Sequence, residues 1–115
     1  MQTWPDKIVE LNAELKGLRS GAPEVMKSFT AMAQAALAPR TLDVKTKELI
    51  AIGIAVAVRC EDCIAFHVRS ALQNGASREE VIEALGMSSY MGAGPSVMYA
   101  SHALKAYEEL ERPKS

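Results

Sequence analysis

Apolar side chains recur every three or four positions in the first third of the chain, which is the spacing of one face of an α-helix. This pattern predicts two amphipathic helices, the first ending at Gly21 and the second running from Pro23 to Pro39. Thr3 and Asp6 are suited to cap the start of the first helix. The apolar stripes are Ile8, Leu11, Leu15 and Leu18 in the first helix and Val25, Met26, Phe29, Met32, Ala33, Ala36 and Leu37 in the second.

Residues 42–59 have no polar face, so their periodicity alone fits either a buried strand or a helix. We favour a helix because Asp43 can cap it, because alanine alternates through the run, and because the length suits a helix. A helix that is apolar all round belongs in a protein interior. The sequence therefore predicts that this is the central and most buried helix.

The rest of the chain predicts three more helices. One begins near Cys60 and ends at Asn74-Gly75, and the next opens with a capping box over residues 77–80. The segment Gly92-Ala-Gly-Pro95 interrupts the pattern, and a last helix follows to about Glu111. We expect an all-α fold of about six helices, forming a single domain over residues 1–115.

The composition of the chain limits the kinds of binding partner and the cellular location that we expect. The net charge is −1 with interspersed signs, which does not favour nucleic acid or an anionic membrane. The longest apolar run, residues 49–58, is half the length of a membrane span, and no signal peptide pattern opens the chain, so we expect a cytoplasmic protein. Apolar residues make up 49% of the chain and small residues crowd Gly86 to Ser101. These features predict a homo-oligomer with the last two helices in the interface. We expect the site that contains the two cysteines, Cys60 and Cys63, to lie near a subunit boundary.

The candidate chemistry lies in the run Cys60-Glu-Asp-Cys63-Ile-Ala-Phe-His67, which holds both cysteines of the chain. On a helix, positions i, i+3 and i+7 share one stripe, so two thiols and an imidazole lie together. Three interpretations stay open on residues alone: a redox pair, part of a zinc site, or two inert buried cysteines. Structural zinc usually has four ligands, and thiols in the cytoplasm are kept reduced, so the pattern favours redox chemistry.

The surroundings of the two thiols differ. Cys60 is at a helix start, where backbone N–H groups favour a thiolate, and Cys63 is one turn from His67, which could act as its base. Glu61 and Asp62 oppose a thiolate because they carry the same charge. Cys63 is our candidate for the attacking thiolate and Cys60 for the resolving thiol, although the helix-start position argues for the reverse order.

Glu48 is the remaining candidate in an otherwise apolar segment. If residues 42–59 and the next helix form a hairpin turning near Arg59, the Glu48 side chain reaches His67 through a water or a tilted crossing. The alternative is a solvated glutamate beside Lys45 and Lys47. Spacing alone leaves both open.

Taken together, Glu48, eleven intervening residues, Cys60-x-x-Cys63, three more residues and His67 resemble the active-site signature of the alkylhydroperoxidase AhpD-like family. This family lies within the carboxymuconolactone decarboxylase superfamily, and the resemblance extends over roughly residues 20–110, including the stretch from Glu80 to Leu104. It implies an all-α fold, a homotrimer or homohexamer, and a CxxC pair that cycles between dithiol and disulfide to reduce a peroxide or disulfide substrate with a dithiol reductant. It also implies that Glu48 is the proton acceptor and His67 the relay.

The sequence departs from the family's peroxidases at Asp62, where they carry a second histidine, which argues against strong peroxidase activity. Decarboxylases of the superfamily generally lack the CxxC, so a non-redox decarboxylase-like enzyme is an alternative with less support. A non-catalytic helical oligomer that binds a metal or small molecule is the other alternative. We expect no flavin, nicotinamide or haem cofactor and no metal, and we interpret His102 as a surface or interface residue.

Overall fold

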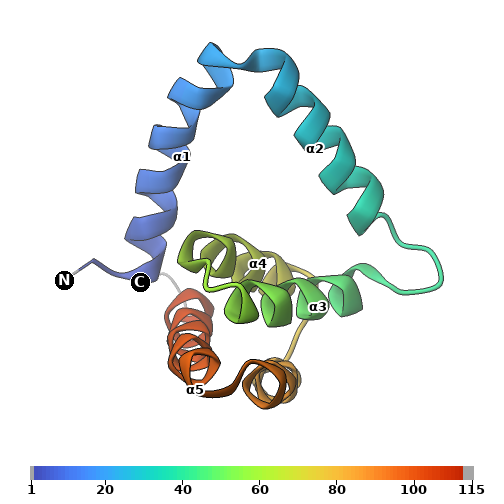
Figure 1. The fold of residues 1–115 in the computed structure, drawn as a ribbon, viewed down its shortest axis with the longest axis vertical. Helices are drawn as coiled ribbons and strands as arrows, with labels where there is room; N and C mark the ends of the chain where they lie inside the picture. The colour runs from blue at the N-terminus through green and yellow to red at the C-terminus, as the bar shows by residue number, and fades with distance from the viewer. Residues whose placement is uncertain (1, 113–115) are drawn as a thin grey trace.

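The computed structural model describes residues 2–112, and its regular structure over that range consists of α-helices, as the sequence predicts (Figure 1). There are five of them: α1 (Trp4–Gly21), α2 (Pro23–Leu37), α3 (Val44–Ala57), α4 (Glu61–Gln73) and α5 (Arg78–Glu111). None of the helices in this range is long and apolar enough to cross a membrane.

The helix starts follow the predicted capping residues. Asp43 Oδ1 accepts a hydrogen bond from the backbone N–H of Thr46 at 2.8 Å, and Thr3 caps α1 in the same way. Ser77 and Glu80 form the predicted capping box, in which each side chain accepts a hydrogen bond from the other residue's backbone N–H. These side chains satisfy N–H groups that a helix leaves without partners, which is why the helices begin where they do.

Helices α3, α4 and α5 form a packed body that contains nearly all of the hydrophobic core. Its buried apolar residues are Ile52, Ala55, Val56, Ile64, Ala65, Val68, Ala71, Ala76, Val81, Leu85, Ala100, Ala103, Ala106 and Tyr107. Many of them are alanine, so the helices approach one another closely. At Gly53 the two helices α3 and α5 are in ordinary van der Waals range, because a Cβ built there would lie 3.8 Å from Ser88 Oγ.

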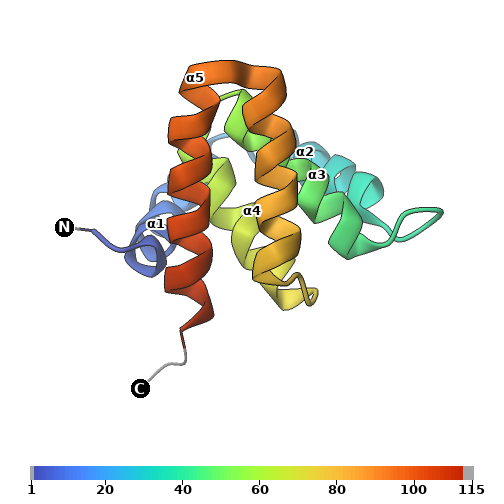
Figure 2. The ribbon, with the colours of Figure 1, turned by 90° about the horizontal axis from the view of Figure 1, so that it is seen from below.

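Helix α5 is sharply bent rather than straight. Ala93 has φ 60° and ψ −149°, and the two limbs on either side of it run next to each other (Figure 2). The break predicted at residues 92–95 is therefore present, and the last two predicted helices are the two limbs of α5. Gly92 is required at this bend, because a Cβ there would lie 2.8 Å from Ser96 Cβ, an atom that side-chain rotation cannot move away.

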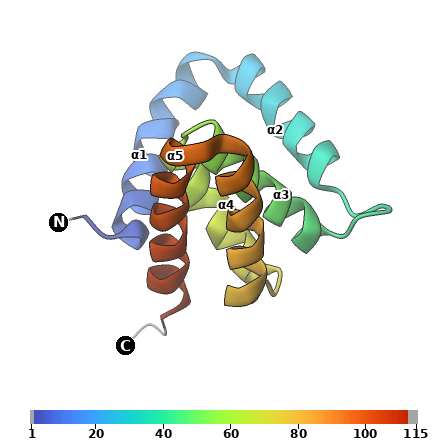
Figure 3. The ribbon, with the colours of Figure 1, turned by 60° about the horizontal axis from the view of Figure 1, so that its bottom comes forward.

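Helices α1 and α2 form an arch that stands over α3 and α4 (Figures 1 and 3). We call residues 4–37 the arm. It contributes a single buried side chain, Ile8, and α2 has none. Val25, Phe29 and Met32 of the predicted apolar stripe on α2 are 64%, 58% and 61% exposed.

The prediction that residues 42–59 form the most buried helix is wrong for one face of α3. Glu48, Ile52, Ala55 and Val56 are buried, whereas Ile54 and Val58 are 58% and 65% exposed. The reason is that α4 and α5 cover only part of the helix surface in a single chain. The face of α3 that α4 and α5 leave uncovered is therefore exposed apolar surface.

Candidate active site

The two cysteines form a disulfide at the start of α4, with 5.2 Å between their Cα atoms. Cys60 is the N-cap residue of the helix, and its Sγ accepts a hydrogen bond from the backbone N–H of Cys63 at 3.1 Å. The cap position is usually held by an oxygen of Ser, Thr, Asp or Asn. A sulfur placed there receives both an N–H group and the positive end of the helix dipole, which stabilise a thiolate once the disulfide opens.

A tight turn between α3 and α4 sets the position of Cys60. Arg59 has φ 62°, and its N–H donates to the carbonyl of Val56 while the N–H of Cys60 donates to the carbonyl of Ala55 at 2.9 Å. This pair of bonds is the Schellman ending of α3, in a place that glycine usually occupies. The turn reverses the chain near Arg59, as the sequence predicts, and brings the thiols back to the end of α3.

Glu48 and His67 meet directly across the α3–α4 contact. His67 Nδ1 lies 2.6 Å from Glu48 Oε1, so no bridging water is needed. The Glu48 side chain is 3% exposed, whereas the His67 side chain is 34% exposed. A carboxylate is rarely buried without a partner, and here the imidazole is that partner.

The alternative of a solvated Glu48 beside two lysines is wrong. Lys45 Nζ instead lies 2.8 Å from Glu80 of α5, and Lys47 Nζ donates to the carbonyl of Ala38 at 2.6 Å. The Lys45–Glu80 contact lowers the pKa of Glu80 and raises the pKa of Lys45, chiefly through the hydrogen bond between them. Both lysines are thus turned toward other partners.

The Glu48 contact decides which nitrogen of His67 is available. If Glu48 is ionised and His67 neutral, Nδ1 donates to Glu48 and Nε2 keeps the lone pair, because an ionised carboxylate only accepts hydrogen bonds. His67 also lies one turn after Cys63 on α4, at the i+4 spacing that makes helix side chains neighbours. The arrangement can take a proton from a group near Cys63 and stabilise the resulting imidazolium through Glu48.

Two residues near the thiols were not identified as part of a site from sequence. Lys7 of α1 lies 3.7 Å from carboxylate oxygens of both Glu61 and Asp62, and His102 Nδ1 of α5 lies 3.0 Å from Glu61 Oε1. His102 is near the surface, with a side chain 47% exposed, as we predicted, but it also contacts the CxxC segment. These contacts join residues far apart in the chain, so local spacing carries no signal for them.

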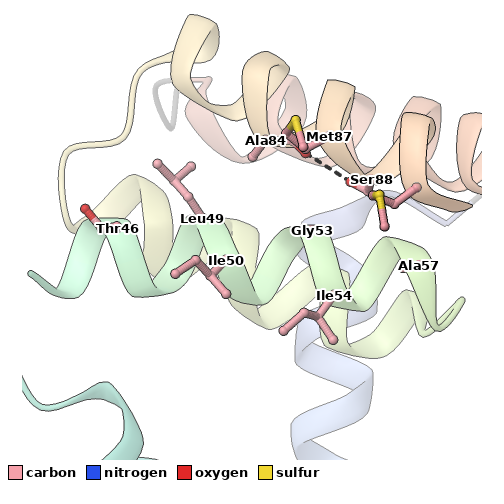
Figure 4. A pocket seen from close by; sticks show the side chains of 10 residues that line it. Thr46, Leu49, Ile50, Gly53, Ile54, Ala57, Ala84, Met87 and Ser88 are labelled. Carbon is pink, nitrogen blue, oxygen red and sulfur yellow. Dashed lines mark hydrogen bonds between the residues drawn. The ribbon is translucent and has the colours of Figure 1, made fainter. Parts of the chain in front are cut away.

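A second feature is an apolar groove of about 410 Å³ between α3 and α5 (Figure 4). Ile50 and Ile54 line it from α3, and Met87 and Met91 line it from α5. The exposed fractions of Ile54, Met87 and Met91 are 58%, 61% and 74%. The groove thus includes the outward face of α3, which the sequence predicts to be covered.

The sequence model of the carboxymuconolactone decarboxylase family matches residues 23–106. The structure superposes on that of a carboxymuconolactone decarboxylase family protein from Legionella pneumophila with a TM-score of 0.91 and 45% identity, covering 95% of this chain and 97% of that one. A family member from Thermotoga maritima, for which a role in the antioxidative response has been suggested, matches with a TM-score of 0.81 and 36% identity over 90% and 89% of the two chains. An uncharacterized protein from Cupriavidus necator is 38% identical over 104 residues, 90% of this chain and 92% of its own.

The chain therefore belongs to the carboxymuconolactone decarboxylase family. The AhpD-like resemblance of its thiol motif falls within the same superfamily.

Proposed function

We propose that this protein is a thiol–disulfide oxidoreductase that uses Cys60 and Cys63 to reduce hydroperoxides or disulfides with electrons from a cellular dithiol. The observation that carries the proposal is the hydrogen bond between His67 and the buried Glu48, one helical turn from the disulfide. A buried carboxylate that orients an imidazole beside a thiol is the arrangement that activates cysteine nucleophiles. The suggested antioxidative role of the Thermotoga maritima relative is consistent with it.

In the peroxide reaction, His67 takes the proton of Cys63, and the thiolate attacks the outer oxygen of a hydroperoxide. The O–O bond breaks, the alcohol leaves with a proton, and Cys63 becomes a sulfenic acid. Cys60 then attacks the Cys63 sulfur, water leaves, and the disulfide forms. The backbone N–H of Cys63, which donates to Cys60 Sγ in the disulfide form, is placed to stabilise a Cys60 thiolate in this second step.

A dithiol restores the enzyme by two exchanges. Its first thiolate attacks the Cys63 sulfur, because Cys60 is the better stabilised leaving thiolate at the helix start. The second thiolate of the reductant then attacks the reductant sulfur of this mixed disulfide. Cys63 leaves as a thiolate, and the reductant becomes a disulfide. We place this cycle in the cytoplasm, where such reductants are kept reduced.

The cysteine roles are tested by trapping. The reduced Cys60→Ser and Cys63→Ser variants are treated with peroxide and a sulfenate probe, and their intact masses are measured. We expect the probe on Cys60→Ser, which keeps Cys63, and a two-dalton loss in the oxidised wild-type protein. A probe adduct only in Cys63→Ser would reverse the roles, and bound zinc without any dithiol–disulfide cycling would refute the redox function.

The proton relay is tested with Glu48→Gln, which keeps the shape of the side chain but removes its charge. We expect peroxide consumption to fall by roughly 10²-fold, because general-base assistance typically contributes that much or more. Glu83→Gln, on an exposed position of α5, is the matched control and should retain full activity. Equal activity of the two variants would exclude Glu48 from the relay.

We also propose that the protein works as a homo-oligomer, trimeric or hexameric, with α5 in the interface. The apolar groove supports this, because its exposed methionines and isoleucines form a continuous unpartnered face on α3 and α5. Met87→Glu should dissociate the assembly, as measured by light scattering at low micromolar concentration. Val9→Glu on α1 is the control, and a single-chain mass for the wild-type protein would refute the assembly.

A further inference from the structure

The two carboxylates between the cysteines are engaged by helices from opposite ends of the chain. Lys7 Nζ of α1 lies 3.7 Å from Glu61 Oε2 and 3.7 Å from Asp62 Oδ1. His102 of α5 takes the other oxygen of Glu61, at 3.0 Å. One lysine therefore faces both acidic residues of the CxxC segment.

The position of Lys7 is fixed by its neighbours on the body. The backbone N–H of Trp4 donates to Glu109 Oε1 of α5 at 2.7 Å, which attaches the start of α1 beside α4. Lys7 Nζ also lies 5.9 Å from the centre of the Trp4 ring, close enough for a cation–π contact. The Lys7 side chain is consequently only 25% exposed.

Without compensation, Glu61 and Asp62 would destabilise a thiolate on Cys60 or Cys63, because like charges nearby disfavour ionisation. We propose that Lys7 is a positioning residue of the redox site: it offsets the charge of Glu61 and Asp62 and so sets the stability of the thiolate and the potential of the Cys60–Cys63 disulfide. This inference rests on the proposed redox function and adds a determinant from outside the motif.

The direction of the effect follows from which redox form carries the charge. The thiolate exists only in the reduced protein, so whatever stabilises it favours the dithiol and makes the disulfide easier to reduce. Removing Lys7 should therefore favour the disulfide. The side chains of Lys7, Glu61 and Asp62 are all partly exposed, which weakens the interactions between their charges. We therefore expect a modest change of about threefold in the dithiol–disulfide equilibrium constant, or about 15 mV.

The test is a set of full-length variants equilibrated with mixtures of reduced and oxidised dithiothreitol, quenched by alkylation and quantified by intact mass. Lys7→Met should shift the equilibrium toward the disulfide by about threefold and lower the thiolate absorbance at 240 nm of the reduced protein at neutral pH. Lys7→Arg should restore both values. Lys16→Met, at an exposed position of the same helix, is the matched control and should behave like the wild type.

The mechanism is tested by repeating the comparison in a Glu61→Gln, Asp62→Asn background. There the equilibrium should shift toward the dithiol, and adding Lys7→Met should bring it back toward the wild-type value, because the potentials of the three charges add at the thiolate. In the normal background the effect of Lys7→Met should shrink at high salt. A Lys7→Met equilibrium equal to that of Lys16→Met would overturn the proposal, as would a Glu61→Gln, Asp62→Asn equilibrium that is not shifted toward the dithiol. Equilibration with dithiothreitol needs no turnover, so this result is independent of whether the protein reduces peroxides.

Discussion

The arm and the body show two outcomes for similar apolar patterns. In the body, helices α3 to α5 bury Ile52, Ile64, Val68 and Val81 completely, and the site residues Glu48 and His67 lie between two of these helices. In the arm, the stripe on α2 follows the same helical spacing, yet no side chain of that helix is buried. Periodicity identifies the face of a helix that needs cover, but the cover itself depends on which other surfaces lie within reach.

The difference also appears in the backbone. Both non-glycine residues with positive φ in residues 2–112, Arg59 and Ala93, lie in the body. Such conformations persist only where the surrounding packing determines them. The body thus holds Cys60 next to a residue with positive φ, whereas the arm reaches the site chiefly through contacts near its first turns, such as Lys7.

The largest expected effect is on the core of the body. Ile52→Ala removes a side chain that is 0% exposed at the contact between α3 and its neighbours. We expect a loss of about 2–5 kcal/mol in the free energy of unfolding, because lost burial and the residual cavity add. Urea titration at fixed protein concentration measures it, and a loss below about 1 kcal/mol would mean that the body packs far more loosely than described.

A smaller effect is expected at Tyr107, whose hydroxyl donates to the carbonyl of Ala76 at 3.0 Å and which is 2% exposed. Tyr107→Phe leaves that carbonyl without its donor, so we expect a loss of about 1–3 kcal/mol by the same titration. A loss that is not distinguishable from zero would show that another donor replaces the hydroxyl.

Burial also raises the pKa of Tyr107 above its usual value. A group with a raised folded-state pKa contributes stability that is present below the unfolded pKa and is lost as the pH rises through the folded value. The wild-type protein should therefore lose stability above about pH 10 more steeply than Tyr107→Phe does. Equal alkaline slopes for the two proteins would contradict this.

Much of the body could be predicted from sequence because its signals are local. Asp43, Ser77 and Cys60 mark helix starts through hydrogen bonds three residues long, and the His67 spacing within one helix needs no knowledge of the fold. The Glu48–His67 contact spans 19 residues, so spacing left it undecided until the α3–α4 crossing was known. Lys7 is more than fifty residues from Glu61 in sequence, and nothing local indicates that pair.

The bend in α5 leads to a further prediction, in which the substitution stabilises the protein. Ala93 has a φ of 60° with an extended ψ, a conformation that is almost exclusive to glycine. Ala93→Gly should raise the free energy of unfolding by about 1 kcal/mol, because the relief of strain exceeds the added freedom of the unfolded chain. Ala100→Gly, at a buried position of the helical second limb, is the comparison and should lower it by about 1–2 kcal/mol, because it loses both helix propensity and a buried methyl group. Destabilisation by both substitutions would show that the Ala93 conformation carries no strain.

The smallest effect is expected on the arm. Phe29→Ser replaces the only aromatic side chain of α2, which is 58% exposed and stands on the face of the helix that no other part of residues 2–112 buries. Little apolar surface is returned to water within a single chain, so the free energy of unfolding should change by less than about 0.5 kcal/mol at micromolar concentration. The comparison with Ile52→Ala then measures how independent the body is of the arm. A loss above about 1 kcal/mol that depends on protein concentration would show instead that the α2 stripe is covered by a second subunit, because only an associated state gives stability that varies with concentration.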